Sequence, residues 1–172
     1  MKEIIWLGRG GQGAFTAAKL LGAAFALKDD NSFSLAFPSF GPERRGAPVR
    51  AFTKLDDKAV LDRSETEKAD YIVILDETLY NDNLQNLLKA GGKILVNSTT
   101  LNDENVIAFD GSKLAKELKI PTVNTVMLGA VGEISHLVSK DNISQAIREY
   151  MPHKLHDKNI TAVEKTVEEV RK

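Results

Sequence analysis

The sequence predicts an α/β protein: a three-layer α/β/α sandwich around a mostly parallel, mixed sheet, Rossmann-like but not a true dinucleotide-binding fold. Three observations predict it. Short apolar runs at residues 4–7, 71–75 and 94–96 each end at a glycine or a polar residue. Segments with helical spacing of apolar residues separate such runs, and residues 13–27 are the richest in Ala and Leu. A proline-rich segment between two strand candidates predicts a local antiparallel excursion, and hence a mixed sheet.

The other elements continue this alternation. The unbroken apolar run at 71–75 is typical of a central strand covered on both faces. A leucine pattern after residue 80 predicts a helix that the pair Gly91-Gly92 closes. Further strands are predicted at 32–37, 49–55, 106–109 and 122–123, and further helices at 112–118, 125–138, 143–150 and 160–170.

The composition is that of an ordinary globular chain. The 172 residues fit one domain spanning 1–172, with 42% hydrophobic and 27% charged residues. A net charge of −1 gives no global attraction to nucleic acid or to a membrane, so neither is an expected partner. No apolar run approaches the length of a membrane span and no signal peptide is evident, so we expect a cytoplasmic location.

The sequence contains no cysteine. Disulfides, thiolate-ligated iron–sulfur clusters and cysteine-type zinc sites are therefore excluded for this chain. The histidines at 136, 153 and 156 are scattered, no serine stands in a nucleophile elbow, and the Gly-Asp-Gly motif of thiamine enzymes is missing. We therefore expect no catalytic residue, no bound metal and no activity of the chain alone.

A glycine loop at residues 8–13 separates the first strand from the first helix and satisfies the pattern G-x-G-x-x-G. Its glycines permit a tight turn, and a helix N-terminus attracts an anion. A dinucleotide site would also need an acidic residue after the second strand, about 20 positions on. Asp29 and Asp30 stand before that strand instead. Three interpretations remain: a nicotinamide or flavin site, a turn that binds nothing, and a site for a phosphate of another ligand.

The stretch from Phe37 to Phe52 is the most distinctive in the chain. It places arginines at 44, 45 and 50 among prolines, glycines and phenylalanines. Arginine suits phosphate and carboxylate because its planar donors pair bidentately, and prolines reduce the ordering cost of a loop. The stretch as a whole predicts an anion site or a subunit contact. For any single arginine, an ion pair with Glu43 is the competing structural role.

Three polar residues stand at the predicted carboxyl ends of strands, where open α/β sheets bind ligands. They are Asp76, Asn97 and Asn124. The competing role, which we favour for Asp76 and Asn124, is the capping of a following helix.

The glycine loop, followed by Phe-Pro-Ser-Phe-Gly-Pro-Glu-Arg-Arg-Gly-Ala-Pro at 37–48, resembles the gamma subunit of pyruvate:ferredoxin oxidoreductases and the corresponding domain of single-chain members. Residues 74–79 and 124–130 look like two further family blocks, and Asn159 falls where the family has a late asparagine. The similarity thus runs in order along nearly the whole chain.

The resemblance implies one subunit of an enzyme that interconverts a 2-oxoacid plus coenzyme A with acyl-coenzyme A plus carbon dioxide. That enzyme uses thiamine diphosphate with Mg²⁺ and passes electrons through [4Fe-4S] clusters to ferredoxin or flavodoxin. The implied partners are alpha, beta and ferredoxin-like delta subunits, which hold those groups, whereas the gamma part helps to form the coenzyme A site. The amino-acid sequence around Ala47 resembles pyruvate-type members of the family more than 2-oxoglutarate-type members.

The residues expected to contact coenzyme A are therefore those of the two motifs together with one strand-end candidate. They are Gly10, Gly11, Gln12, Gly13, Arg44, Arg45, Arg50 and Asn124. The alternative is a free-standing NAD(P)- or FAD-binding Rossmann-type enzyme.

Overall fold

The computed structural model describes residues 1–39 and 45–172. Within them, six strands form one sheet in the order β2-β3-β1-β4-β5-β6. The strands are β1 (Lys2–Arg9), β2 (Phe33–Pro38), β3 (Pro48–Asp56), β4 (Ala69–Ile74), β5 (Leu88–Asn97) and β6 (Val106–Phe109). β1, β4, β5 and β6 are parallel, and β3 runs antiparallel to both of its neighbours. The predicted mixed, mostly parallel α/β sheet is confirmed.

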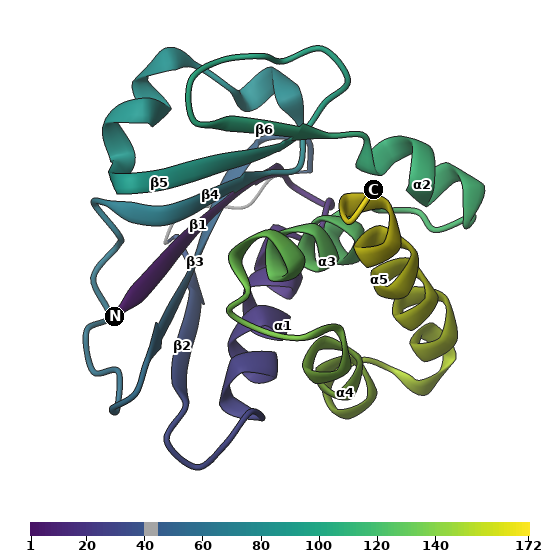
Figure 1. Cartoon of the computed structure of the whole chain (residues 1–172), viewed down its shortest axis with the longest axis horizontal. Helices are drawn as coiled ribbons and strands as arrows, with labels where there is room; N and C mark the ends of the chain where they lie inside the picture. Colours follow the sequence, from purple (N-terminus) through teal and green to yellow (C-terminus); the bar gives the residue numbers. More distant parts are fainter. Residues whose placement is uncertain (40–44) are drawn as a thin grey trace.

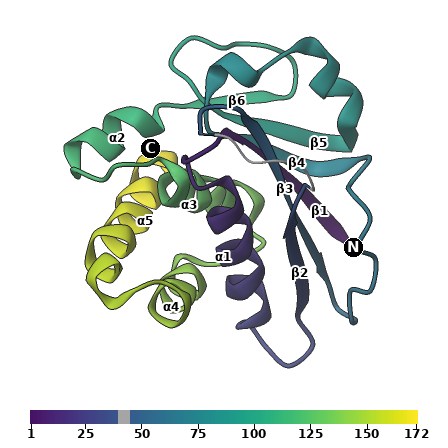
Figure 2. The ribbon, with the colours of Figure 1, turned by 180° about the vertical axis from the view of Figure 1, so that it is seen from behind.

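The α-helices gather on one side of the sheet, as Figures 1 and 2 show from opposite directions. They are α1 (Ala14–Ala26), α2 (Gly111–Glu117), α3 (Asn124–Ser135), α4 (Lys140–Tyr150) and α5 (His156–Val170), with the short 3-10 helix η3 (His153–Leu155) before α5. The other face carries a thinner layer that includes two 3-10 helices, η1 (Glu77–Leu79) and η2 (Asp82–Leu87). None of the described helices is both long and apolar enough to cross a membrane.

Side-chain alternation along β1 explains why the sheet is buried on both faces. Ile4 and Trp6 belong to the core under the α-helices, whereas Ile5 and Leu7 belong to the core on the opposite face. All four are 6% exposed or less. The central position of β1 therefore follows from a run with no polar residue between its ends.

One predicted helix, together with the glycine pair expected to end it, differs from the structure. The leucines after residue 80 form the 3-10 helix η2 instead of an α-helix, because Leu88 already pairs with Ala69 in the sheet. Gly91 and Gly92 lie inside β5, where the register with β4 shifts. Gly91 has a φ of +76°, and a Cβ on Gly92 would lie 3.0 Å from the carbonyl oxygen of Ala69. The glycine pair therefore permits a β-bulge and does not end a helix.

Candidate functional site

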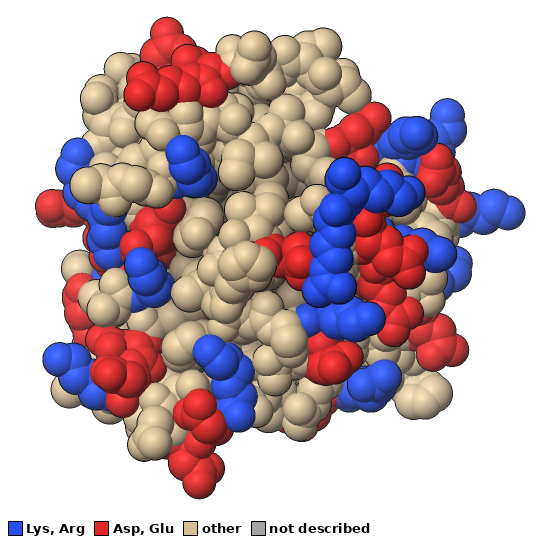
Figure 3. All heavy atoms as spheres, in the orientation of Figure 1, with Lys and Arg blue, Asp and Glu red and all other residues tan. Residues whose placement is uncertain are grey.

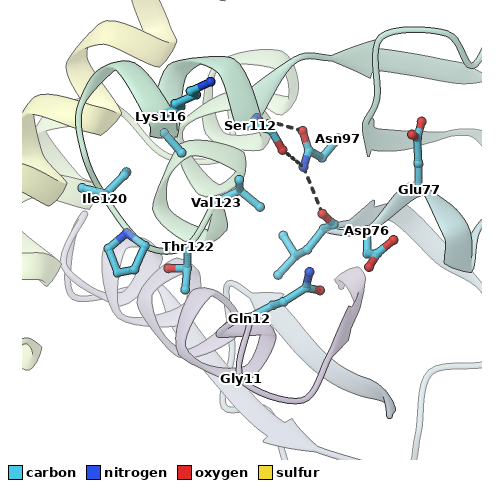
Figure 4. Close-up of a pocket in the computed structure, with 13 residues that line it drawn as sticks. Gly11, Gln12, Asp76, Glu77, Asn97, Ser112, Lys116, Ile120, Thr122 and Val123 are labelled. Carbon is cyan, nitrogen blue, oxygen red and sulfur yellow. Dashed lines mark hydrogen bonds between the residues drawn. The ribbon is translucent and has the colours of Figure 1, made fainter. Parts of the chain in front are cut away.

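A cleft of about 650 Å³ opens where the parallel strands end at their carboxyl termini (Figure 4). Gly11 and Gln12, from the loop after β1, line one side of it. Asp76 follows β4, and Asn97 ends β5. The far wall comes from α2 and the segment that leads into α3, including Ser112, Lys116, Ile120 and Thr122. The cleft therefore lies at the edge where ligands of open α/β sheets bind.

The glycine loop is a tight turn that closes on itself. The backbone N–H of Gln12 donates to the carbonyl oxygen of Arg9 at 3.0 Å, and the Gln12 side chain accepts from the backbone N–H of Arg9 at 2.7 Å. Gly11 and Gly13 have φ values of +92° and +82°, which side chains rarely adopt. The glycines at these two positions are therefore required by the backbone.

The N-terminus of α1 follows directly after this turn, with Gly13 as its N-cap. No side chain of the described residues caps it, and no acidic residue occupies its first turn. The first backbone N–H groups of a helix have no partner within the helix, and they carry the positive end of its dipole. The loop can therefore offer hydrogen-bond donors to an anion.

Arg50 lies beside that helix N-terminus. It shares a second cavity, of about 280 Å³, with glycines of the loop and with Phe15 of α1. The loop and the start of β3 are joined by the backbone: Gly10 donates to the carbonyl oxygen of Ala47 at 2.8 Å and accepts from Gly46 at 3.2 Å. Two sequence motifs that are far apart in the chain thus form one site.

Of the other two predicted arginines, Arg45 and Arg44, the structure describes only Arg45. Arg45 is exposed, and its backbone forms a bridge with Gly10. Arg44 lies outside the described residues. Phe37 and Phe52 do not line the site, because their rings pack 5.2 Å apart in the core on the face away from the α-helices.

Asn124 is the first residue of α3 and not the end of a strand, because residues 122–123 form no strand. This corrects the predicted last strand: β6 is the edge of the sheet, and the Thr122 hydroxyl instead donates to the Asn124 side chain at 2.6 Å. The Asn124 amide donates to the carbonyl oxygen of Gly13 at 3.4 Å and is 6% exposed. Asn124 therefore holds the glycine loop from behind.

Asp76 and Asn97 make hydrogen bonds that hold together the segments at the edge of the cleft. Asp76 caps η1 by accepting from the backbone N–H of Thr78 at 3.0 Å, as the capping interpretation predicted. Asn97 donates to the carbonyl oxygen of Leu75 and to the hydroxyl of Ser112, at 3.1 and 2.9 Å. The amide of Asn97 thus joins the ends of β4 and β5 to the start of α2.

Arg9 is a site residue that sequence reasoning missed. Its guanidinium donates to the Asp76 carboxylate at 3.2 Å, to the carbonyl oxygen of Gly46 at 3.1 Å and to the Thr78 hydroxyl at 2.8 Å. Hydrogen bonds from the hydroxyl and the backbone N–H of Thr78, followed by the charge of Arg9, hold the pKa of Asp76 below its ordinary value, so the carboxylate stays ionised at neutral pH. One signal was present in the sequence, since Arg9 is a charged side chain inside a glycine motif.

The acidic pair that a dinucleotide site would need lies away from this edge. Asp29 and Asp30 follow the C-terminal end of α1, whose 13 residues span about 20 Å. Asp29 instead accepts from the backbone N–H of Asn31 and from the hydroxyl of Ser32, each at 2.9 Å. Asp29 and Asp30 are therefore not placed for the ribose contact of a nicotinamide site.

The surface charge is mixed. On the face shown in Figure 3, Lys and Arg are interleaved with Asp and Glu over the helices. This pattern agrees with the net charge of −1.

The family model for pyruvate ferredoxin/flavodoxin oxidoreductase matches residues 3–169. The chain belongs to this family. Over its whole length it is 44% identical to pyruvate synthase subunit PorC of Methanothermobacter thermautotrophicus, of which it covers 97%. The crystal structure of pyruvate oxidoreductase subunit PORC from Thermotoga maritima is 31% identical, with a TM-score of 0.79 over 97% of this chain and 95% of that one.

A third comparison shows the family fold inside a larger polypeptide. The 2-oxoglutarate:ferredoxin oxidoreductase from Magnetococcus marinus was solved with 2-oxoglutarate, coenzyme A and succinyl-CoA bound. It matches 99% of this chain and 31% of that one with a TM-score of 0.80, and the 20% identity shows the fold alone. The chain is thus a gamma-type subunit of a 2-oxoacid:ferredoxin oxidoreductase, and a free-standing nucleotide-binding enzyme is not supported.

Proposed function

We propose that this gamma subunit serves a pyruvate:ferredoxin oxidoreductase, which interconverts pyruvate and coenzyme A with acetyl-coenzyme A and carbon dioxide. The 44% identity to a pyruvate synthase subunit over the full chain supports pyruvate as the 2-oxoacid. Ferredoxin or flavodoxin accepts the electrons. The role of the chain itself is to bind and orient coenzyme A and to dock against its partner subunits.

Alpha, beta and delta subunits hold the redox and thiamine groups in this proposal. The chain has no cysteine, so its residues do not fit a thiolate-ligated [4Fe-4S] cluster. Within residues 1–39 and 45–172, no group of three or more His, Asp or Glu is placed to hold a metal ion such as the Mg²⁺ of thiamine diphosphate. When bound by the partners, these groups supply the carbanion and electron-transfer chemistry.

One observation carries the coenzyme A proposal: Arg50 and the uncapped N-terminus of α1 open onto the same cavity. A phosphate placed there meets backbone donors, the helix dipole and an arginine together. The larger cleft on the other side of Gly11 is lined by two carboxylates, Asp76 and Glu77, against one cation, Lys116, so it is less favourable for phosphates. The phosphate end of coenzyme A therefore binds between Gly10–Gly13 and Arg50, with Arg44 and Arg45 of the same motif as further candidate partners, and the uncharged arm extends toward the cleft. Asn124 contributes by holding the loop in place.

The first test is the activity of the chain without its partners. The purified polypeptide should catalyse no coenzyme A-dependent reduction of an electron acceptor with pyruvate, whereas the complex that co-purifies with it should. Turnover by the isolated chain with any 2-oxoacid would overturn the proposed division of labour.

The second test addresses the phosphate site. In the assembled enzyme, Arg50→Ala should raise the KM for coenzyme A about tenfold while leaving the KM for pyruvate unchanged, because it removes one charge-assisted hydrogen bond to a phosphate. Arg148→Ala is the matched control, since Arg148 is an exposed arginine of α4. An Arg50 variant with an unchanged KM for coenzyme A would contradict the assignment.

A further inference from the structure

A segment without helix or strand, residues 57–68, joins β3 to β4; we call it the strap. It crosses the sheet face that lies away from the α-helices. Its contacts show this, since Lys54, Glu3 and Phe52 share that face of the sheet, and the strap bonds to the first two. Its own side chains are mostly exposed. The strap is therefore held by a small number of polar contacts.

One of these contacts is to a buried lysine. Lys54 is 0% exposed, and its Nζ lies 2.8 Å from Asp62 of the strap and 3.7 Å from Glu3. A buried ammonium is stable only when it is paired and hydrogen-bonded. Asp62 is oriented for this contact, since its other oxygen accepts from the backbone N–H and the hydroxyl of Ser64 at 2.9 and 2.6 Å. Asp62 thus fastens the middle of the strap to the sheet.

The same strap reaches the arginine-bearing part of the site. Glu65, three residues after Asp62, accepts a hydrogen bond from the Ser39 hydroxyl. The backbone N–H of Ser39 in turn donates to the carbonyl oxygen of Arg50 at 2.9 Å. Thr66 donates to Glu3 at 3.2 Å and closes the far end. A continuous set of contacts therefore runs from Lys54 through the strap to Arg50.

We propose that Glu65 and the Lys54–Asp62 pair are positioning residues, which hold Ser39 and the backbone of Arg50 in the place where the Arg50 guanidinium meets a phosphate of coenzyme A. This role rests on the proposed function of Arg50. By the alternation along β3, the Arg50 side chain starts on the same face of the sheet as Phe52 and the strap, at the end of β3 that lines the cavity beside the α1 N-terminus. The effect of the strap passes through the Ser39 hydroxyl.

The experiment uses the assembled enzyme with Ser39→Ala, Glu65→Ala and the double variant. Each single change should raise the KM for coenzyme A about 3- to 10-fold, the range for losing one hydrogen bond, and leave kcat and the KM for pyruvate unchanged. The double variant should be no worse than either single one, because both remove the same bond. Glu65→Gln keeps an acceptor and should restore most of the affinity.

Two further variants separate positioning from stability. Lys54→Met replaces the buried ammonium by an apolar chain of similar length, so it should release the strap with little loss of thermal stability and reproduce the KM effect. Glu67→Ala is the control within the strap, since Glu67 is exposed and has no hydrogen bond or ion pair with the rest of the described chain. Trypsin cleavage after Arg45 should be faster in Glu65→Ala than in Glu67→Ala, which reports the position of this stretch without coenzyme A.

The outcomes are distinct. If Arg50→Ala weakens coenzyme A but Ser39→Ala and Glu65→Ala do not, the strap has no positioning role. Additive effects in the double variant would also overturn it. If Arg50→Ala leaves the KM for coenzyme A unchanged while Glu65→Ala accelerates cleavage, the strap holds this stretch but the proposed phosphate site is wrong.

Discussion

Gly13→Ala should cost about 2–4 kcal/mol of the free energy of unfolding and lower kcat/KM for coenzyme A at least tenfold. The φ of +82° at Gly13 is itself unfavourable for any side chain. In addition, an added Cβ would lie 2.5 Å from the Nδ2 of Asn124, so either the loop or α3 must move. Denaturant unfolding of the subunit and steady-state kinetics of the assembled enzyme measure the two effects.

Gly11→Ala is the matched control for stability. Gly11 has a φ of +92°, but a Cβ there would meet nothing within 4 Å, so only the backbone strain of about 1–2 kcal/mol remains. Asn124→Ala combined with Gly13→Ala should recover part of the loss, because it removes the two closest atoms. Equal destabilisation by Gly11→Ala and Gly13→Ala would show that Asn124 does not confine the loop.

Trp6→Ala should destabilise the subunit by about 3–5 kcal/mol. Trp6 is 0% exposed in the centre of β1, and its indole N–H donates to the Thr53 hydroxyl at 3.0 Å. That hydroxyl donates in turn to the carbonyl oxygen of Ala18 in α1 at 2.9 Å. The ring therefore fills the core and also joins β1 and β3 to α1, the helix whose N-terminus forms the site.

Thr53→Val separates the polar part of this loss from the packing part. It keeps the shape but leaves the buried indole N–H of Trp6 without its partner, so it should cost about 1–3 kcal/mol. Tyr150→Ala, at a residue that is 66% exposed, should change the free energy of unfolding by less than about 0.5 kcal/mol. A Trp6→Ala subunit as stable as the Tyr150→Ala one would contradict the role of this contact.

Local patterns in the sequence were enough to predict the strand–helix alternation and the position of the glycine loop. Ile4–Leu7 and Tyr71–Leu75 are apolar on both faces, which indicates central strands, and Gly11 and Gly13 stand where the backbone requires a glycine. The helix predicted before Gly91-Gly92 was wrong because the same leucine spacing also suits a 3-10 turn. Pairing of Leu88 with β4 decided between them.

The candidate site residues could be selected from the sequence, but their neighbours in space could be predicted only in part. Arg50 was singled out from its motif, but its place beside the α1 N-terminus depends on β3 lying next to β1. Asn124 was selected as the end of a strand, yet it lies behind Gly13 because α3 packs against α1. These contacts join residues that are distant in the chain.

The sequence by itself determined the alternation of strands and helices, the position of the glycine loop, the absence of thiol ligands and the membership of a family. The tertiary structure alone decided that Arg9 joins Asp76, Thr78 and Gly46, and that Lys54 is buried beneath Asp62. The physical reason is that periodicity tells which face of a strand a side chain occupies, whereas the order of the strands and the path of the loops decide what covers that face.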